Sequence, residues 1–264
     1  MTIDKKYWKD LVFVKGNFPD IKCPTCDKGH LRPIMESFNC EETFESNQLR
    51  ENDDWDPMMV DYRFVLLLKC TNTDCLDINS CIGIGYNDQV TEFDKYYQEC
   101  SNVIIPNYYP LYFIPSIKII PVNDLYPEKI KIELTNSFSH FFSDLSSCAN
   151  KIRVCTEILM DELKIKKTEI QKTKRRSIPL HSRILNYKKI NPEVADYLLA
   201  IKWIGNSGSH VDKLTKDDVL DAYILLDHSL NKLYNNEEKK IKKLTKEINK
   251  KRAALSTKRR KSGT

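Results

Sequence analysis

Glycine is scarce in this sequence, and long apolar runs are absent. Its 264 residues include only seven glycines. Loops that cradle phosphates need several glycines in a short stretch, and the nearest match, Gly83-Ile84-Gly85, offers two. The longest apolar run, Phe64 to Leu68, is far shorter than the roughly 20 residues of a membrane span. The sequence therefore predicts neither a P-loop or Rossmann enzyme nor a membrane protein.

The composition indicates a folded cytoplasmic protein. The apolar share is 41%, which is enough for a core. The segment 1–8 has no apolar run like that of a secretion signal, so we expect a cytoplasmic location. In that compartment the nine cysteines indicate metal binding or buried thiols rather than disulfides.

Charge is divided unevenly along the chain. Residues 1–150 carry a net charge of −9, and residues 151–264 carry +14. Before residue 135 the sequence is rich in Pro, Asn, Tyr and short β-branched runs, whereas afterwards it has the Leu, Ile, Lys and Glu content of helices. We therefore predict an α+β protein in three parts. These are a zinc-ribbon-like module of short strands with its connector (1–125), an all-α four-helix bundle (126–235) and a basic helix or tail (236–264).

Two cysteine pairs predict the metal site. One pair, Cys23 and Cys26, forms a CxxC, and the other, Cys70 and Cys75, forms a CxxxxC after an apolar run. Two such turns can supply four sulfur ligands to a structural zinc ion. Gly29 suits the sharp turn after the first pair. The alternatives are four unrelated buried thiols, or replacement of one ligand by Cys40, Cys81 or His30.

Pro-interrupted apolar runs join the two halves. Pro106, Pro110, Pro115 and Pro121 break the runs of residues 103–122, which is typical of edge strands or an extended connector. The aromatic side chains here anchor the two halves together or, alternatively, stack on bases.

The C-terminal half shows helical periodicity. Apolar residues recur every three or four positions over 135–163, again over 180–187 and 192–204, and again over 216–234. Gly205 and Gly208 are expected to end the third helix. Thr215 to Asp218 predict a capping box for the fourth.

The motifs of this half resemble a known family. Ala149-x3-Arg153-x3-Glu157 is followed by Leu180-x2-Arg183 and then by the segment IKWIGNSGSH, residues 201–210. This order resembles a bacterial domain of unknown function found in restriction-type and phage-defence proteins and similar to the HEPN helical superfamily. The resemblance covers residues 125–235 closely and 20–125 loosely, and it implies a role in nucleic-acid-linked antiviral defence. Homodimerisation through the bundle, or binding to another protein of a defence system, would agree with it.

The same resemblance implies an alternative, a metal-independent ribonuclease. Catalytic HEPN proteins place an R-x4-6-H motif at a dimer cleft, where it promotes attack of a 2′-hydroxyl on the adjacent phosphate. Here the candidate residues are Lys202, Asn206 and His210. A lysine stands where arginine is expected, and it supplies a point charge rather than a bidentate fork. Capping of the helix end explains Asn206 and His210 equally well. Arg153 and Glu157 form an intrahelical ion pair or else meet His210.

Basic clusters predict nucleic acid, RNA or DNA, as the partner. Lys and Arg dominate the segment 164–176 and the tail from Lys239, and such clusters contact phosphates. Solvated lysine-rich segments explain them equally well, and the tail's apolar spacing also fits a protein partner. The candidate nucleic-acid-binding residues are Lys164, Lys166, Lys167, Lys172, Lys174, Arg175, Arg176, Lys258, Arg259 and Arg260.

We therefore expect a zinc-containing protein that acts in defence or stress by binding nucleic acid or assembling a complex, and the sequence leaves open whether it is also an enzyme. A ribonuclease toxin that uses His210, or a structural subunit of a defence complex, is the alternative.

Overall fold

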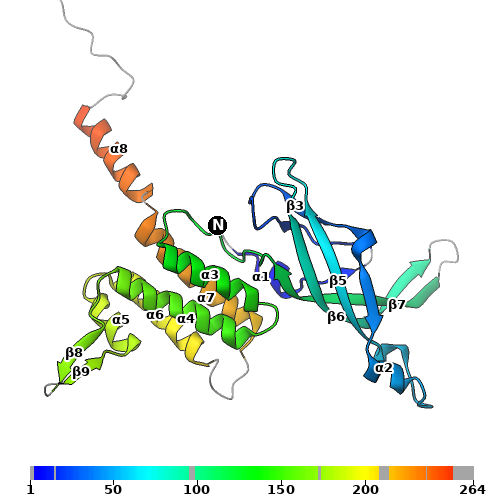
Figure 1. Ribbon diagram of the computed structural model, residues 1–264. Coiled ribbons are helices and arrows are strands. Elements are labelled where there is room, and N and C mark those ends of the chain that lie inside the picture. Colours follow the sequence, from blue (N-terminus) through cyan, green and yellow to red (C-terminus); the bar gives the residue numbers. More distant parts are fainter. Residues whose placement is uncertain are drawn as a thin grey trace, which may run out of the picture.

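The structure is a computed structural model, which describes residues 3–14, 16–94, 99–171, 174–207, 214–235 and 237–251. A curled antiparallel sheet forms the first part, and helices form the second (Figure 1). A short helix, α1 (Lys5–Lys9), lies between them and contacts the helical part, where Lys5 pairs with Asp221 at 2.5 Å.

In the part of the chain that the structure describes, the sheet has seven strands in the order β1-β7-β6-β5-β3-β2, with β4 also paired to β5. All of its pairings are antiparallel. The strands are β1 (Phe13–Val14), β2 (Ile21–Lys22), β3 (His30–Pro33), β4 (Asn39–Glu42), β5 (Asp61–Cys70), β6 (Ile78–Asp94) and β7 (Glu99–Ile114). Three short helices interrupt it: η1 (Met35–Ser37), α2 (Phe44–Leu49) and η2 (Pro57–Met59).

The alternation of side chains along β5 determines which face of the sheet is covered. Phe64, Leu66 and Leu68 are buried, while Val65 and Leu67 between them are exposed. Successive side chains of a strand point to opposite faces. The buried set packs with residues of the N-terminal segment, including Leu11 and Phe13.

The predicted zinc ribbon of short strands is wrong. The N-terminal part is a curled half-barrel, in which β6 has 17 residues and β7 has 16. The prolines suggested interruption, but β7 continues through Pro106 and Pro110. The register shifts between Ile82 and Gly83, and a Cβ on Gly83 would lie 2.9 Å from Pro110 Cα. A bulge in β7 beside Pro110, together with the lack of a side chain on Gly83 opposite, therefore lets β7 accept Pro110.

Within the described residues, the helical part contains five packed helices and one that extends away from them. The packed helices are α3 (Glu128–His140), α4 (Leu145–Glu162), α5 (Leu180–Lys188), α6 (Pro192–Ser207) and α7 (Lys216–Tyr234), and the extended one is α8 (Glu237–Lys251). The periodicity over 135–163 predicted one helix, but α3 ends and Asp144 caps a new helix by accepting from Ser147 N. The predicted capping box at Thr215 and Asp218 is confirmed. In the described part of the chain, no helix is both long and apolar enough to cross a bilayer.

A buried tyrosine joins three of the packed helices. Tyr223 on α7 is fully buried, and its hydroxyl lies 2.8 Å from Ser137 Oγ of α3 and 3.1 Å from Cys148 Sγ of α4. Ile119 and Ile120, from the segment that follows the sheet, belong to the same core cluster. The two halves of the chain are therefore packed together and not only tethered.

Gly205 lies within α6, where we had predicted the helix end. The helix continues at least to Ser207, and Gly208, the other residue predicted to end it, lies outside the described residues. A Cβ on Gly205 would lie 2.8 Å from Arg153 Cβ on α4 and 3.2 Å from the Ala149 carbonyl oxygen. The glycine is therefore needed for the close approach of α4 and α6.

We expect Gly205→Ala to destabilise the protein. Alanine favours a helix over glycine by about 1 kcal/mol, but overpacking costs about 1–3 kcal/mol, and here the contact is with Cβ and backbone atoms that cannot rotate away. Chemical denaturation should show a net loss of about 1 kcal/mol. Asn186→Ala, at an exposed position of α5, is the control. A Gly205→Ala variant as stable as the wild type would contradict this packing.

Candidate metal centre and basic hairpin

Two turns at one end of the sheet carry the four predicted cysteines. Cys23 follows β2 directly, and Cys26 lies in the turn that leads to β3. Cys70 is the last residue of β5, and Cys75 lies in the turn before β6. Because β3 pairs with β5, with Leu31 opposite Cys70, the sheet places the two turns next to each other.

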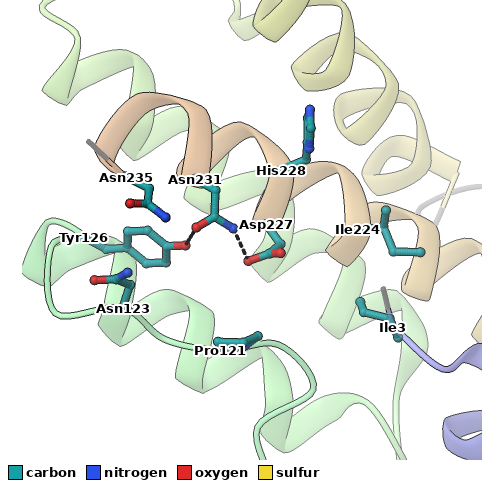
Figure 2. A pocket seen from close by; sticks show the side chains of 9 residues that line it. All are labelled: Ile3, Pro121, Asn123, Tyr126, Ile224, Asp227, His228, Asn231 and Asn235. Carbon is teal, nitrogen blue, oxygen red and sulfur yellow. Dashed lines mark hydrogen bonds between the residues drawn. The ribbon is translucent and has the colours of Figure 1, made fainter. Parts of the chain in front are cut away.

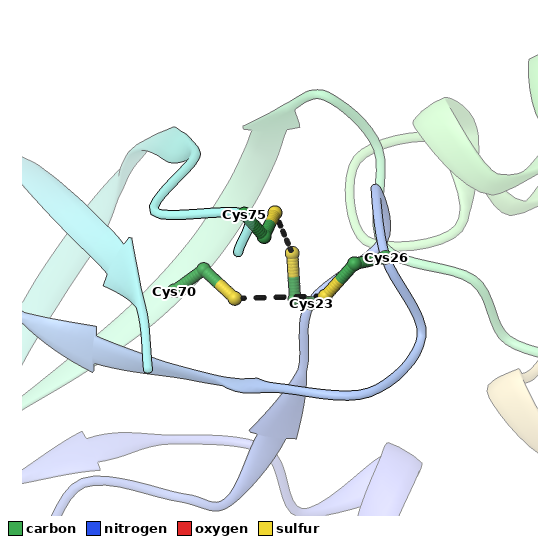
Figure 3. A group of neighbouring side chains, drawn as sticks. All are labelled: Cys23, Cys26, Cys70 and Cys75. Atoms are coloured by element: carbon green, nitrogen blue, oxygen red, sulfur yellow. Dashed lines mark hydrogen bonds between the residues drawn. The ribbon is translucent and has the colours of Figure 1, made fainter. Parts of the chain in front are cut away.

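The four sulfur atoms converge on one point (Figure 3). All of them lie within 4.8 Å of one another. The Cys26–Cys70 sulfur distance is 3.7 Å, and the Cys23–Cys75 distance is 4.0 Å. A tetrahedral ion with metal–sulfur bonds of about 2.3 Å places its sulfurs about 3.8 Å apart. The cluster can therefore hold a metal ion.

Backbone amides support two of the sulfurs. Gly29 N donates to Cys26 Sγ at 3.3 Å, and Asn72 N donates to Cys70 Sγ at 3.4 Å. The amides of Gly29 and Lys28 lower the pKa of Cys26 to about 6, whereas burial raises the pKa of Cys70 to about 12. Thiolates are the form that binds metals, and a cation at the centre would compensate the buried charge.

The backbone adopts the same left-handed conformation directly after each cysteine pair. Asp27 and Leu76, which directly follow Cys26 and Cys75, both have positive φ, at 55° and 52°. Gly29 was predicted to serve the sharp turn of the backbone, but its role is to leave space. A Cβ at this position would lie 2.5 Å from Cys70 Sγ and 2.7 Å from Asn72 N. It is therefore space beside the sulfurs, and not a positive φ, that requires glycine.

The alternative ligands lie elsewhere. Cys81 is buried in the sheet core, and Cys40 packs against that core. His30 Nδ1 lies 2.9 Å from Asp20 Oδ1. Among the residues that the structure describes, Cys23, Cys26, Cys70 and Cys75 are the only group of three or more metal-binding side chains.

Two of the three candidate ribonuclease residues, Lys202 and Asn206, lie near the C-terminal end of α6. Lys202 Nζ lies over the Trp203 ring, 3.3 Å from its centroid. Asn206 is in the last turn of α6. His210 lies outside the described residues, so the ribonuclease alternative stays a prediction. Arg153 and Glu157 form the expected intrahelical ion pair, at 2.9 Å.

The basic segment after α4 forms a β-hairpin. Strands β8 (Thr168–Gln171) and β9 (Lys174–Ser177) pair with each other, from Thr168 opposite Ser177 to Gln171 opposite Lys174. The hairpin projects away from the helices (Figure 1). All four side chains of β9 are exposed, so Lys174, Arg175 and Arg176 are presented to solvent.

The remaining predicted basic residues divide into two groups. Lys164, Lys166 and Lys167 are exposed between α4 and β8, and Lys167 Nζ pairs with Asp161 at 3.1 Å. The others lie outside the described residues; they are Lys172, Lys258, Arg259 and Arg260. Sequence patterning missed that the described cluster is a ribbon, because two four-residue strands leave too short a pattern to recognise.

A cavity of about 520 Å³ lies against α7, away from these groups (Figure 2). Tyr126 Oη donates to Asn231 Oδ1 at 3.1 Å, and Asn231 Nδ2 donates to Asp227 Oδ1 at 2.9 Å. Burial raises the pKa of Asp227. The network ties the segment before α3 to α7, and none of the sequence-predicted site residues lines the cavity.

Two family models match the chain, and each is described as a domain of unknown function. One, Domain of unknown function (DUF8608), matches residues 11–113, which include the four cysteines. The other, Domain of unknown function (DUF4145), matches residues 135–251, which include the basic hairpin and α8. No curated protein and no solved structure matches the chain.

We expect Gly29→Ala to lower the metal content of the purified protein. The added methyl group displaces Cys70 Sγ or the Asn72 amide, and either change disturbs the sulfur geometry. Metal analysis would show the loss, and Cys26→Ser should give the same result. Cys100→Ser, which alters an exposed cysteine outside the cluster, should retain the metal. Full metal content in Gly29→Ala would contradict the proximity of Gly29 to the centre.

Proposed function

We propose that the protein binds nucleic acid through the β8–β9 hairpin and acts by binding or complex assembly, in a defence or stress response. The observation that carries the proposal is the exposure of Lys174, Arg175 and Arg176 on a hairpin that stands away from the helices. The resemblance of the helical half to defence-associated HEPN-like domains supports the biological setting.

The shape of the hairpin suits a nucleic acid duplex. The major groove of B-DNA admits a two-stranded β-ribbon. Lys174 and Arg176 are two residues apart on β9, so they point to one face of the ribbon, whereas Arg175 points to the other. The carboxylate of Glu169 stands opposite Arg176. Two cations on one face can contact phosphates. Such contacts position the ribbon on the nucleic acid but do not read the base sequence.

The salt dependence of binding tests this function. Removal of two phosphate contacts should reduce the slope of log affinity against log salt by roughly 2 for duplex DNA. We expect this of Lys174→Ala with Arg176→Ala, measured by fluorescence anisotropy with duplex and single-stranded DNA and RNA.

Lys129→Ala with Lys189→Ala is the matched control. It removes the same charge from exposed positions outside the hairpin and should leave the slope nearly unchanged. Equal losses in both variants would mean that net charge, and not the hairpin, governs binding. Absence of binding by the wild type at low salt would refute the function.

We also propose that the ion of the cysteine cluster is zinc and that its role is structural. Four thiol ligands complete a tetrahedral shell and leave no open position for a substrate. Cysteine-only tetrahedral sites suit zinc or iron. The ion would hold the β2–β3 turn against the β5–β6 turn.

Metal analysis of protein purified without added metal should find one zinc per chain and little iron. Because metal binding contributes to the free energy of folding, a strong chelator should lower the midpoint of thermal unfolding, and added zinc should restore it. Cys26→Ser should be nearly insensitive to both treatments. Stoichiometric iron would refute the identity of the ion, and an unfolding midpoint unaffected by the chelator would refute the structural role.

A further inference from the structure

An acidic lobe extends from the far edge of the sheet. It comprises residues 41–59, from the end of β4 through α2 and the following loop to η2 (Figure 1). Ser46 is buried and fixes the lobe, because its hydroxyl donates to Glu42 Oε1 at 2.8 Å and accepts from Asp61 N at 3.1 Å. Arg50 adds a bidentate pair with Glu42, the shorter contact being 2.7 Å. These hydrogen bonds hold the start of α2 against β4 and β5.

The surface of this lobe is both apolar and negatively charged. Phe44 is 76% exposed, and Leu49, Met58 and Met59 are each more than 40% exposed. The lobe contains seven carboxylates and one basic residue, Arg50. Four exposed apolar side chains in one lobe can contribute to an interface, and the carboxylates select a partner of positive charge.

The last described helix, α8, has the opposite character. Ile241, Leu244 and Ile248 are 61%, 47% and 40% exposed, and their spacing places them on one face of the helix. The helix contains seven lysines and three glutamates. It extends away from the packed helices (Figure 1), so its apolar face is left without a covering partner within the described chain.

Charge allows each of these surfaces to bind the other but not itself. Pairing α8 with a second α8 would bring lysines together, and pairing two lobes would bring carboxylates together. Like charges brought together at an interface disfavour association. Pairing α8 with the lobe buries apolar side chains of both and opposes lysines to carboxylates. The lobe and α8 lie at opposite ends of the molecule (Figure 1), so the contact joins two copies.

We propose that α8 of one copy docks on the acidic lobe of a second copy of this chain. The contact is heterologous, because each surface meets a different one, and such contacts build rings or open chains. An amphipathic helix on an apolar surface is a common mode of recognition. This proposal does not depend on the nucleic-acid function.

The test uses two variants, each lacking one of the two surfaces. The lobe variant carries Phe44→Ser with Glu45→Lys, and the helix variant carries Leu244→Ser with Lys243→Glu. All of these side chains are exposed, so both variants should keep the fold, which circular dichroism and thermal unfolding would verify. The masses in solution are measured by sedimentation equilibrium, on protein freed of nucleic acid.

The average mass of the wild type should rise with concentration over about a hundredfold range, and less so at high salt. Each variant alone should remain monomeric. An equimolar mixture of the two should form a one-to-one complex, because the intact helix of one finds the intact lobe of the other. Ile190→Ser with Lys189→Glu, an equivalent change at exposed residues after α5, should associate like the wild type.

Three results would overturn the proposal. The first is a wild type that remains monomeric at all concentrations. The second is association of either variant alone to the wild-type extent. The third is a mixture that behaves as the sum of its separate components. If the wild type is monomeric and the helix variant alone weakens binding to duplex DNA, α8 contacts nucleic acid instead.

Discussion

The approach of four sulfur atoms at one end of the sheet is the contact that joins the β2–β3 turn to the β5–β6 turn. Cys23 and Cys26 come from the turn between β2 and β3, and Cys70 and Cys75 from the turn between β5 and β6. A bound ion would connect these turns through metal–sulfur bonds. This connection would matter because β2 has only two residues and contributes few hydrogen bonds to the sheet. Gly29 leaves the space that lets the turns meet.

The separation of acidic and basic residues is the second main feature of the structure. The fold places the two kinds of charge on different surfaces. The acidic excess of the first half is concentrated in part on the lobe beyond β4, while the basic excess of the second half appears on the β8–β9 hairpin and on α8. These surfaces stand apart from the packed core. Both proposals rest on this distribution: the hairpin would bind phosphates, and the lobe and α8 would join two copies of the chain.

The success of sequence reasoning differed between the two halves for a physical reason. Helices are local structures, so their apolar periodicity and the capping box at Thr215 could be predicted. The error at Asp144 arose because apolar spacing continued across a break of four residues between α3 and α4. The sheet depends on pairings between distant residues, such as Leu31 with Cys70. Its curvature and its long strands β6 and β7 were therefore missed, and a smaller metal module was predicted instead.

The sequence alone indicated which four cysteines come together, from the spacing of the two pairs. It also indicated which segments of the chain are basic. Ligand turns are local, and charge needs no neighbour to be counted. Only the tertiary structure decided that Gly205 serves helix packing, that β7 accommodates Pro110 beside a bulge and opposite Gly83, and that the basic segment is a ribbon. Each of these depends on atoms brought close by the fold from separate elements or strands, and a linear pattern does not contain that proximity.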